Sequence, residues 1–251
     1  MTLDEFIKEL KPYLDKDMVI FTGAGLSTAS GIKDFRGKNG LFKEKINAEE
    51  ILSHHFFMEN PIEFYKFFRD KLINDNVKPN LMHEVIAMLE EEGVVSGVIT
   101  QNIDGLDTMA GTKNVIEIHG NAQEFYCIEC GIKYNLSYVN ETDEVPICRK
   151  CGGILKPNIV LYEEPLNQIE IWDSQKLIKS AKSMLVLGST LRVNPAAGLV
   201  EEFVEYKGKD ESKKLFIVNM GATNYDQQAD YKYDGDIIEV AKKIKEYKKE
   251  K

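Results

Sequence analysis

Short apolar runs recur along the chain and predict a set of buried strands. The runs are Met18 to Phe21, Val94 to Thr100, Val115 to Ile118, Met184 to Gly188 and Leu215 to Asn219. Helical patterns precede or follow most of these runs, and such alternation favours a largely parallel sheet covered on both faces. A chain of 251 residues is long enough for one such domain with an inserted module. The sequence therefore predicts an α/β fold.

Apolar residues at helical spacing predict amphipathic helices between the strands. Thr2 and Glu5 form a capping-box pattern ahead of the first helix, Pro61 starts another, and Asn80 caps a third. A last helix is expected to run from Asp236 to Lys251. The apolar sides of these helices are expected to pack in the core.

A glycine-rich loop, Thr22 to Thr28, follows the first predicted strand. Glycines beyond a strand let backbone N–H groups approach a diphosphate, although a tight strand-to-helix turn uses the same residues. A dinucleotide-binding dehydrogenase would continue with a long helix and a second strand that ends in an acidic residue. Here further glycines interrupt the region, which also carries Asp34-Phe35-Arg36. The pattern predicts a phosphate-binding loop that departs from the ordinary dinucleotide-binding unit.

Polar or glycine-bearing residues follow four of the predicted strands. The clusters are Gln101 to Asp104, His119-Gly120, Gly188 to Thr190 and Asn219 to Gly221. Because ligands of parallel sheets sit outside the carboxyl ends of the strands, these clusters predict one composite site. Turn formation alone explains any single cluster but rarely needs a glutamine, a carboxylate and a histidine at successive strand ends. An imidazole titrates near neutral pH, so His119 is the candidate general base.

All the cysteines fall in two pairs, Cys127-x-x-Cys130 and Cys148-x-x-Cys151. This spacing is typical of a zinc ribbon, in which four thiolates fill a tetrahedral coordination sphere. No position is then left for water or substrate, so one structural zinc ion is expected. The surrounding module, Asn121 to Lys156, has nearly balanced charge, which favours a scaffold over a nucleic-acid-binding ribbon.

The net charge limits which classes of partner the protein is expected to bind. A formal net charge of −9 argues against a nonspecific nucleic-acid binder but leaves a basic protein substrate open. Apolar runs long enough to span a membrane are lacking, and the first residues are acidic where a signal peptide would be basic. We therefore expect a cytoplasmic protein with no membrane partner and no direct nucleic-acid partner.

In combination these motifs resemble the sirtuin (Sir2) family of NAD-dependent protein lysine deacylases, over nearly the whole chain. The resemblance implies a Rossmann-type large lobe and a smaller lobe made of a zinc ribbon plus helices. Within one catalytic domain, residues 1–251, the large lobe would comprise 1–36, 81–120 and 157–251. Residues 37–80 would form the helical and cofactor-loop part of the small lobe, and residues 121–156 the zinc-ribbon module.

The resemblance also implies the site residues and the reaction. His119, Asn102 and Asp104 would be catalytic. NAD would contact Gly23, Ala24, Gly25, Thr28, Ile32, Asp34, Phe35, Arg36, Gln101, Asn102, Ile103, Asp104, His119, Gly188, Ser189, Thr190, Asn219 and Asp236. The acylated peptide would bind Val160, Tyr162 and Val193, and Cys127, Cys130, Cys148 and Cys151 would hold zinc.

In the implied reaction NAD is consumed and an acetyl or other neutral acyl group leaves a protein lysine. Nicotinamide leaves the ribose, the acyl oxygen attacks the same carbon, and His119 activates a ribose hydroxyl as general base. The products would be free lysine, nicotinamide and O-acyl-ADP-ribose. Two alternatives remain open from the sequence: protein mono-ADP-ribosyl transfer, and a non-catalytic NAD-sensing zinc-ribbon module.

The sequence departs from the family pattern at several positions. Lys33 stands where proline is usual, Asp107 replaces a common histidine, and Glu163 replaces a glycine beside the expected peptide groove. Tyr65 and Arg69 are one residue too far apart for the Tyr-x-x-Arg pair of the desuccinylase branch, so a neutral acyl group is predicted.

Overall fold

A computed structural model describes residues 1–34, 40, 47–73 and 76–250. The larger lobe is built on a six-stranded sheet of order β3-β2-β1-β7-β8-β9 in the described chain. Its strands are β1 (Met18–Thr22), β2 (Val95–Thr100), β3 (Val115–Glu117), β7 (Ser183–Leu187), β8 (Lys214–Val218) and β9 (Tyr231–Tyr233). Every pair of neighbours in this sheet is parallel. The predicted α/β fold with a largely parallel sheet is confirmed.

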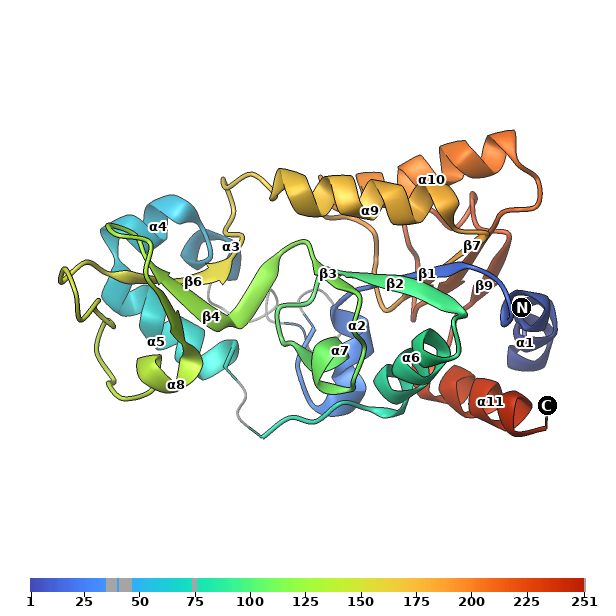
Figure 1. Ribbon diagram of the computed structural model, residues 1–251, viewed down its shortest axis with the longest axis horizontal. Coiled ribbons are helices and arrows are strands. Elements are labelled where there is room, and N and C mark those ends of the chain that lie inside the picture. The colour runs from blue at the N-terminus through green and yellow to red at the C-terminus, as the bar shows by residue number, and fades with distance from the viewer. Residues whose placement is uncertain (35–39, 41–46, 74–75, 251) are drawn as a thin grey trace.

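Helices cover both faces of this sheet (Figure 1). The helices α1 (Leu3–Leu10), α6 (Leu81–Glu91) and α11 (Ile237–Lys249) lie on one face, and α9 (Gln168–Ser180) and α10 (Gly198–Lys209) on the other. Successive side chains of a strand point to opposite faces. Met18 and Ile20 therefore pack in the first core, whereas Val19 and Phe21 pack in the second.

The helix starts follow their capping residues. The Thr2 side chain accepts from the Glu5 backbone N–H, and the Glu5 carboxylate accepts in return from the Thr2 N–H at 2.8 Å. Asn80 caps α6, and Asp236 caps α11. These side chains satisfy N–H groups that a helix leaves unpaired at its first turn.

The smaller lobe has a three-stranded antiparallel sheet, and a helical segment packs against it (Figure 1). Its elements are α3 (Ala48–Ile51), α4 (His54–Glu59), α5 (Pro61–Lys71), β4 (Gly120–Cys127), β5 (Lys133–Asn135), α8 (Leu136–Val139) and β6 (Leu155–Ile159). Aromatic side chains join the two parts: the Phe68 ring on α5 lies 5.9 Å from the Phe125 ring on β4, edge to face. The helices and the cysteine module therefore share one core.

Short elements complete the described chain. They are 3-10 helices at Lys11–Tyr13 and Thr28–Ser30, α2 (Ala24–Ser27) and α7 (Leu106–Met109). Within the described ranges, no helix combines the length and apolar character that crossing a membrane requires.

Candidate functional site

A cleft of about 470 Å³ opens where the sheet of the large lobe meets the small lobe. Of the residues singled out in the sequence, those that line it are Ala24, Gly25, Thr28, Asp34, Gln101, Asn102, Ile103, His119, Val160, Tyr162, Gly188, Ser189, Thr190, Val193, Asn219 and Asp236. They follow β1, β2, β3, β6, β7, β8 and β9, so separate strand ends meet at one cavity. This is the place where parallel sheets bind ligands.

Three expected cofactor residues, Gly23, Ile32 and Asp104, are not part of the cleft lining. The Gly23 carbonyl accepts a hydrogen bond from Asn102 of the lining, and the Asp104 carboxylate accepts one from Ser27 of the loop after β1. Gly23 and Asp104 therefore lie directly behind the lining. Phe35 and Arg36 fall outside the described residues.

Glycines bring the loop after β1 against the end of β7. The Gly25 N–H donates to the Gly188 carbonyl at 2.8 Å, and a Cβ on Gly25 would lie 2.7 Å from that oxygen. Gly188 has a φ of +66°, and a Cβ there would lie 2.2 Å from the Leu26 nitrogen. Only residues without side chains allow this approach, which leaves a backbone-lined hollow of the kind that accepts a diphosphate.

His119 is held in one orientation. Its Nδ1 lies 3.0 Å from the Gln101 carbonyl oxygen, which can only accept, so Nδ1 carries the proton of the neutral ring. Nε2 is then left as a proton acceptor. Burial lowers the pKa of His119, against an opposing hydrogen bond to Gln101. The following Gly120 has a φ of +77°, and a Cβ there would lie 2.0 Å from the Asn158 oxygen, so the turn requires glycine.

A polar network fixes the loop after β2. The Asn102 amide donates to the Gly23 carbonyl and to the Ser27 hydroxyl, both at 3.2 Å. Ser27 donates to Asp104 at 2.7 Å, and the other carboxylate oxygen accepts from the Leu106 N–H at 2.9 Å. Burial raises the pKa of Asp104, while these two hydrogen bonds oppose the shift. The network ties the loops after β1 and β2 into one rigid wall.

Gln101 retains an unused donor in the cleft. Its Oε1 accepts from the Ser189 hydroxyl at 3.3 Å, whereas its buried Nε2 has no hydrogen-bond partner among the described residues. A buried donor without a partner is costly. A hydroxyl or phosphate oxygen of a ligand would satisfy it, so the glycine hollow and Gln101 together fit a dinucleotide such as NAD.

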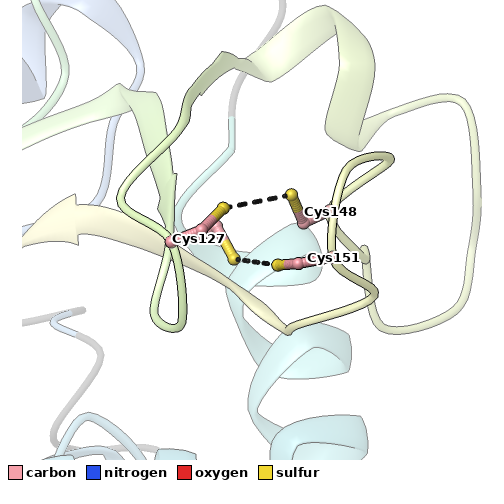
Figure 2. A group of neighbouring side chains, drawn as sticks. Cys127, Cys148 and Cys151 are labelled. Atoms are coloured by element: carbon pink, nitrogen blue, oxygen red, sulfur yellow. Dashed lines mark hydrogen bonds between the residues drawn. The ribbon is translucent and has the colours of Figure 1, made fainter.

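The cysteine sulfurs of the small lobe face one another (Figure 2). Cys127 and Cys151 are 3.4 Å apart between sulfurs, and Cys130 and Cys148 are 3.6 Å apart. All the ligand atoms lie within 4.8 Å of one another. Four sulfurs about 2.3 Å from a tetrahedral zinc ion would be separated by roughly 3.8 Å. The donor set and its spacing therefore fit one structural zinc ion.

Comparison with known proteins decides the family. The model of the Sir2 family matches residues 23–195, which is more than half of the chain. The chain belongs to the Sir2 family. It is 43% identical over 248 residues to an NAD-dependent protein deacetylase of Clostridium perfringens, covering 96% of this chain and 99% of the relative. A protein of the same name from Thermotoga maritima is 42% identical, covering 95% and 98%.

Solved Sir2 structures superimpose closely on this chain. Sir2 with a p53 peptide and NAD+ has a TM-score of 0.86 at 39% identity, covering 98% of this chain and 99% of that one. Sir2 with a deacetylated p53 peptide and 3′-O-acetyl-ADP-ribose has a TM-score of 0.88 at 40% identity, covering 98% of both chains. The expected sirtuin architecture, a parallel-sheet lobe with a four-cysteine module, is confirmed.

The structure accounts for the Tyr65–Arg69 spacing and for the glutamate at position 163. The Tyr65 hydroxyl donates to the Leu155 carbonyl at 2.5 Å, and Arg69 donates to the carbonyls of Asp143 and Glu144 at 2.9 and 2.6 Å. Both side chains stabilise the small lobe, and neither lines the cleft. They are therefore not placed to bind an acidic acyl group.

Glu163 lies at the rim of the cleft with a φ of 78°, a conformation that favours glycine. Its side chain pairs with His55 of α4 at 2.7 Å. The backbone turn that glycine would make is thus retained with a carboxylate added.

The cleft also includes residues that sequence reasoning did not single out. They include hydrophobic Leu52 and Leu72 from the helical segment, and Arg192 and Asn194 from the loop after β7. Nothing in the periodicity separates Leu52 or Leu72 from core leucines, because each directly follows the last residue of a helix, α3 or α5. Arg192 and Asn194 surround the predicted Val193, and that adjacency is the signal that could have found them.

Proposed function

We propose that this chain removes acetyl, or another neutral acyl group, from protein lysine side chains and consumes NAD in doing so. The single observation that carries the proposal is the position of His119. Its ring is fixed by Gln101 and shares one cleft with the glycine hollow of Gly25 and Gly188. The names of the Sir2 relatives and the ligands in the solved Sir2 structures support the same activity.

Each group of residues in the cleft has a proposed role in the reaction. NAD supplies a ribose whose bond to nicotinamide breaks, and the acyl oxygen takes the place of nicotinamide on that carbon. A ribose hydroxyl then receives the acyl carbon, and one water molecule is consumed as the lysine amine leaves. His119 Nε2 accepts the proton of that hydroxyl. Asn102 in the cleft lining and Asp104 behind it orient the nicotinamide amide. The diphosphate is proposed to lie in the hollow that Gly25 and Gly188 leave open, lined by Ala24, Thr28, Ser189 and Thr190. Asn219 and Asp236 receive the adenosine end.

The acylated peptide is proposed to lie between two segments at the cleft rim. One carries Val160 and Tyr162 after β6, and the other carries Val193 after β7. Both rims belong to the same cavity as His119, so an acyl-lysine inserted between them would point toward the imidazole. Zinc is proposed to hold the small lobe that carries one rim. The lobe boundaries, a cytoplasmic location and the lack of a nucleic-acid partner stay predictions.

Incubation with NAD and an acetyl-lysine peptide tests the proposal. We expect equal amounts of deacetylated peptide, nicotinamide and O-acetyl-ADP-ribose by mass spectrometry. His119→Ala is expected to lower kcat by at least about 100-fold, because a positioned general base contributes on that order. NAD affinity measured by calorimetry should be largely retained, since the diphosphate contacts come from the glycine loops.

Mass spectrometry of the same products also distinguishes the alternative functions. Peptide-independent release of nicotinamide at full rate would instead indicate an NAD hydrolase, and a gain of ADP-ribose on the target would indicate mono-ADP-ribosyl transfer. NAD binding without turnover on any acyl peptide would indicate a sensing module. Since burial lowers the pKa of His119 below its ordinary value of 6.5, kcat should be flat above pH 7 and fall in acid.

A further inference from the structure

The segment of residues 160–164, which carries one rim of the cleft, is joined to the helices of the small lobe. Ser53 and Tyr162 form a parallel β-bridge. The His54 N–H donates to the Tyr162 carbonyl at 3.0 Å, and the Tyr162 N–H donates to the Leu52 carbonyl at 2.9 Å. The backbone at the start of α4 therefore supports this rim.

Two consecutive histidines of α4 pair with two consecutive glutamates of this segment. His55 Nδ1 lies 2.7 Å from Glu163 and its Nε2 lies 3.0 Å from Glu50 of α3, while His54 Nδ1 lies 2.9 Å from Glu164. The His55 backbone N–H also donates to Glu163, at 3.1 Å. We call this group the His55 clasp; it consists of the side chains of Glu50, His55 and Glu163.

The geometry of the clasp requires a protonated histidine. An ionised carboxylate can only accept hydrogen bonds, so both ring nitrogens of His55 must donate to their glutamates. Neutral imidazole has a single N–H, and only imidazolium satisfies both contacts. On deprotonation one of the two pairs, Glu50 or Glu163, loses its hydrogen bond.

The charges around His55 favour the imidazolium. Glu50 faces it from α3 and Glu163 from the rim segment, and hydrogen bonds to these two raise the pKa of His55 above its ordinary 6.5. The neighbouring His54 pairs with Glu164, which also binds the buried Lys156 of β6 at 2.9 Å. The pairing with His55 in turn lowers the pKa of Glu163, mainly through the His55 backbone N–H.

We propose that the His55 clasp is a protonation-dependent positioning device for the acyl-peptide rim, which holds residues 160–164 against α3 and α4 when His55 is charged. The proposal rests on the proposed function, because it assigns peptide binding to that rim. His55 and Glu163 are positioning residues, since they act through the backbone of Tyr162. The NAD half of the cleft, around Gly25 and Gly188, has no part in the clasp.

The sign of the pH dependence follows from the raised pKa. The clasp is complete below that pKa and is lost as the pH rises through it, at values above 6.5. The side chains are half exposed, 44% for His55 and 51% for Glu163, so solvent screens the pair. We therefore expect a change of about threefold in the KM for peptide, with kcat and the KM for NAD unchanged by the clasp.

Kinetics of variants test the proposal. His55→Gln removes the charge, and Glu163→Gly removes the carboxylate while suiting the positive φ. At pH 6.5 either change should raise peptide KM about threefold, and the double variant should do no more than one of them. As the pH rises through the raised pKa of His55, the difference between the His55→Gln variant and the wild type should disappear. Asp173→Asn, which removes an exposed pair with Lys176 on α9, is the control and should change nothing.

Hydrogen exchange reads the clasp without substrate. The amides of His54 and Tyr162 should exchange about threefold faster in His55→Gln than in the wild type at pH 6.5, and this difference should disappear as the pH rises through the raised pKa of His55. Equal exchange at pH 6.5 would overturn the clasp even in an active enzyme. Faster exchange with unchanged peptide KM would overturn its role in substrate positioning. A wild-type chain that deacetylates no peptide would instead refute the proposed function, while exchange would still test the clasp.

Discussion

Burial sets the protonation of Asp107, the residue that replaces a common sirtuin histidine. Its side chain lies behind the Asn102–Asp104 wall and is only 3% exposed. Its Oδ1 has no hydrogen-bond partner among the residues that the structure describes. Desolvation, together with the nearby charges of Asp104 and Glu117, raises the pKa of Asp107 to about 7. The carboxyl therefore gains its charge inside the physiological range, in a place that disfavours charge.

Asp107→Asn is predicted to stabilise the protein at alkaline pH. A group that binds its proton more tightly when folded lowers stability as the pH rises, here between about 4 and about 7. The neutral isostere escapes this penalty, so its free energy of unfolding should exceed that of the wild type by on the order of 2 kcal/mol at pH 8. Urea unfolding at a series of pH values measures the difference.

The gain must vanish in acid for this account to hold. At pH 4 both side chains are neutral in the folded protein, and the two unfolding curves should coincide. Asp173→Asn on the surface of α9 controls for the loss of one negative charge and should show no such trend. An advantage of Asp107→Asn that is independent of pH would mean that packing, not titration, is the cause.

At the scale of elements, the contact between the loop after β1 and the end of β7 sets the shape of the NAD half of the cleft. Gly188→Ala would place a Cβ against the backbone of Leu26 and would force a side chain onto a φ of +66°. We predict weaker NAD binding and a loss of about 1 to 3 kcal/mol of stability. Calorimetric NAD titration and thermal unfolding measure the two effects.

Gly208→Ala in α10 is the matched control. A Cβ at Gly208 would meet nothing within 4 Å, and alanine favours the helix by about 0.5 to 1 kcal/mol. This variant should be slightly more stable than the wild type with unchanged NAD affinity. If both alanines behaved alike, the close approach would not be what limits the loop.

The strands differ in how well the sequence predicts them. β1, β7 and β8 are buried on both faces, so each contains a run of four consecutive apolar residues. β9 has three partly buried residues at the sheet edge, and no apolar run marks it. β6 contains Pro157, which argues against a strand in the sequence but is tolerated because β6 is an edge of the small sheet.

At the scale of the whole molecule, the cleft could be predicted in part. Parallel strands end at one edge of a sheet, which is why Gln101, His119 and Ser189 could be expected to meet. The clasp could not be predicted, because His55 and Glu163 are 108 residues apart and nothing in the sequence marks them as partners. Contacts between the lobes depend on packing that periodicity does not encode.

Zinc is expected to hold the small lobe together and, through it, the peptide rim. Buried Cys127 and Cys148 belong to the core that α5 shares with β4 and β6. Structural zinc contributes on the order of 10 kcal/mol to the folding of small domains. We predict about one zinc ion per chain by atomic absorption, lost in Cys130→Ala or with a chelator under reducing conditions.

Metal loss should unfold one lobe and spare the other. Hydrogen exchange should show lost protection in β4 and β6, while β1, β7 and β8 stay protected because their cores lie on the two faces of the large sheet. Deacetylation should stop, since residues 160–164 directly follow β6, and zinc added back to the chelated protein should restore both signals. Full protection of β4 and β6 in metal-free protein would show that the aromatic core alone maintains the lobe.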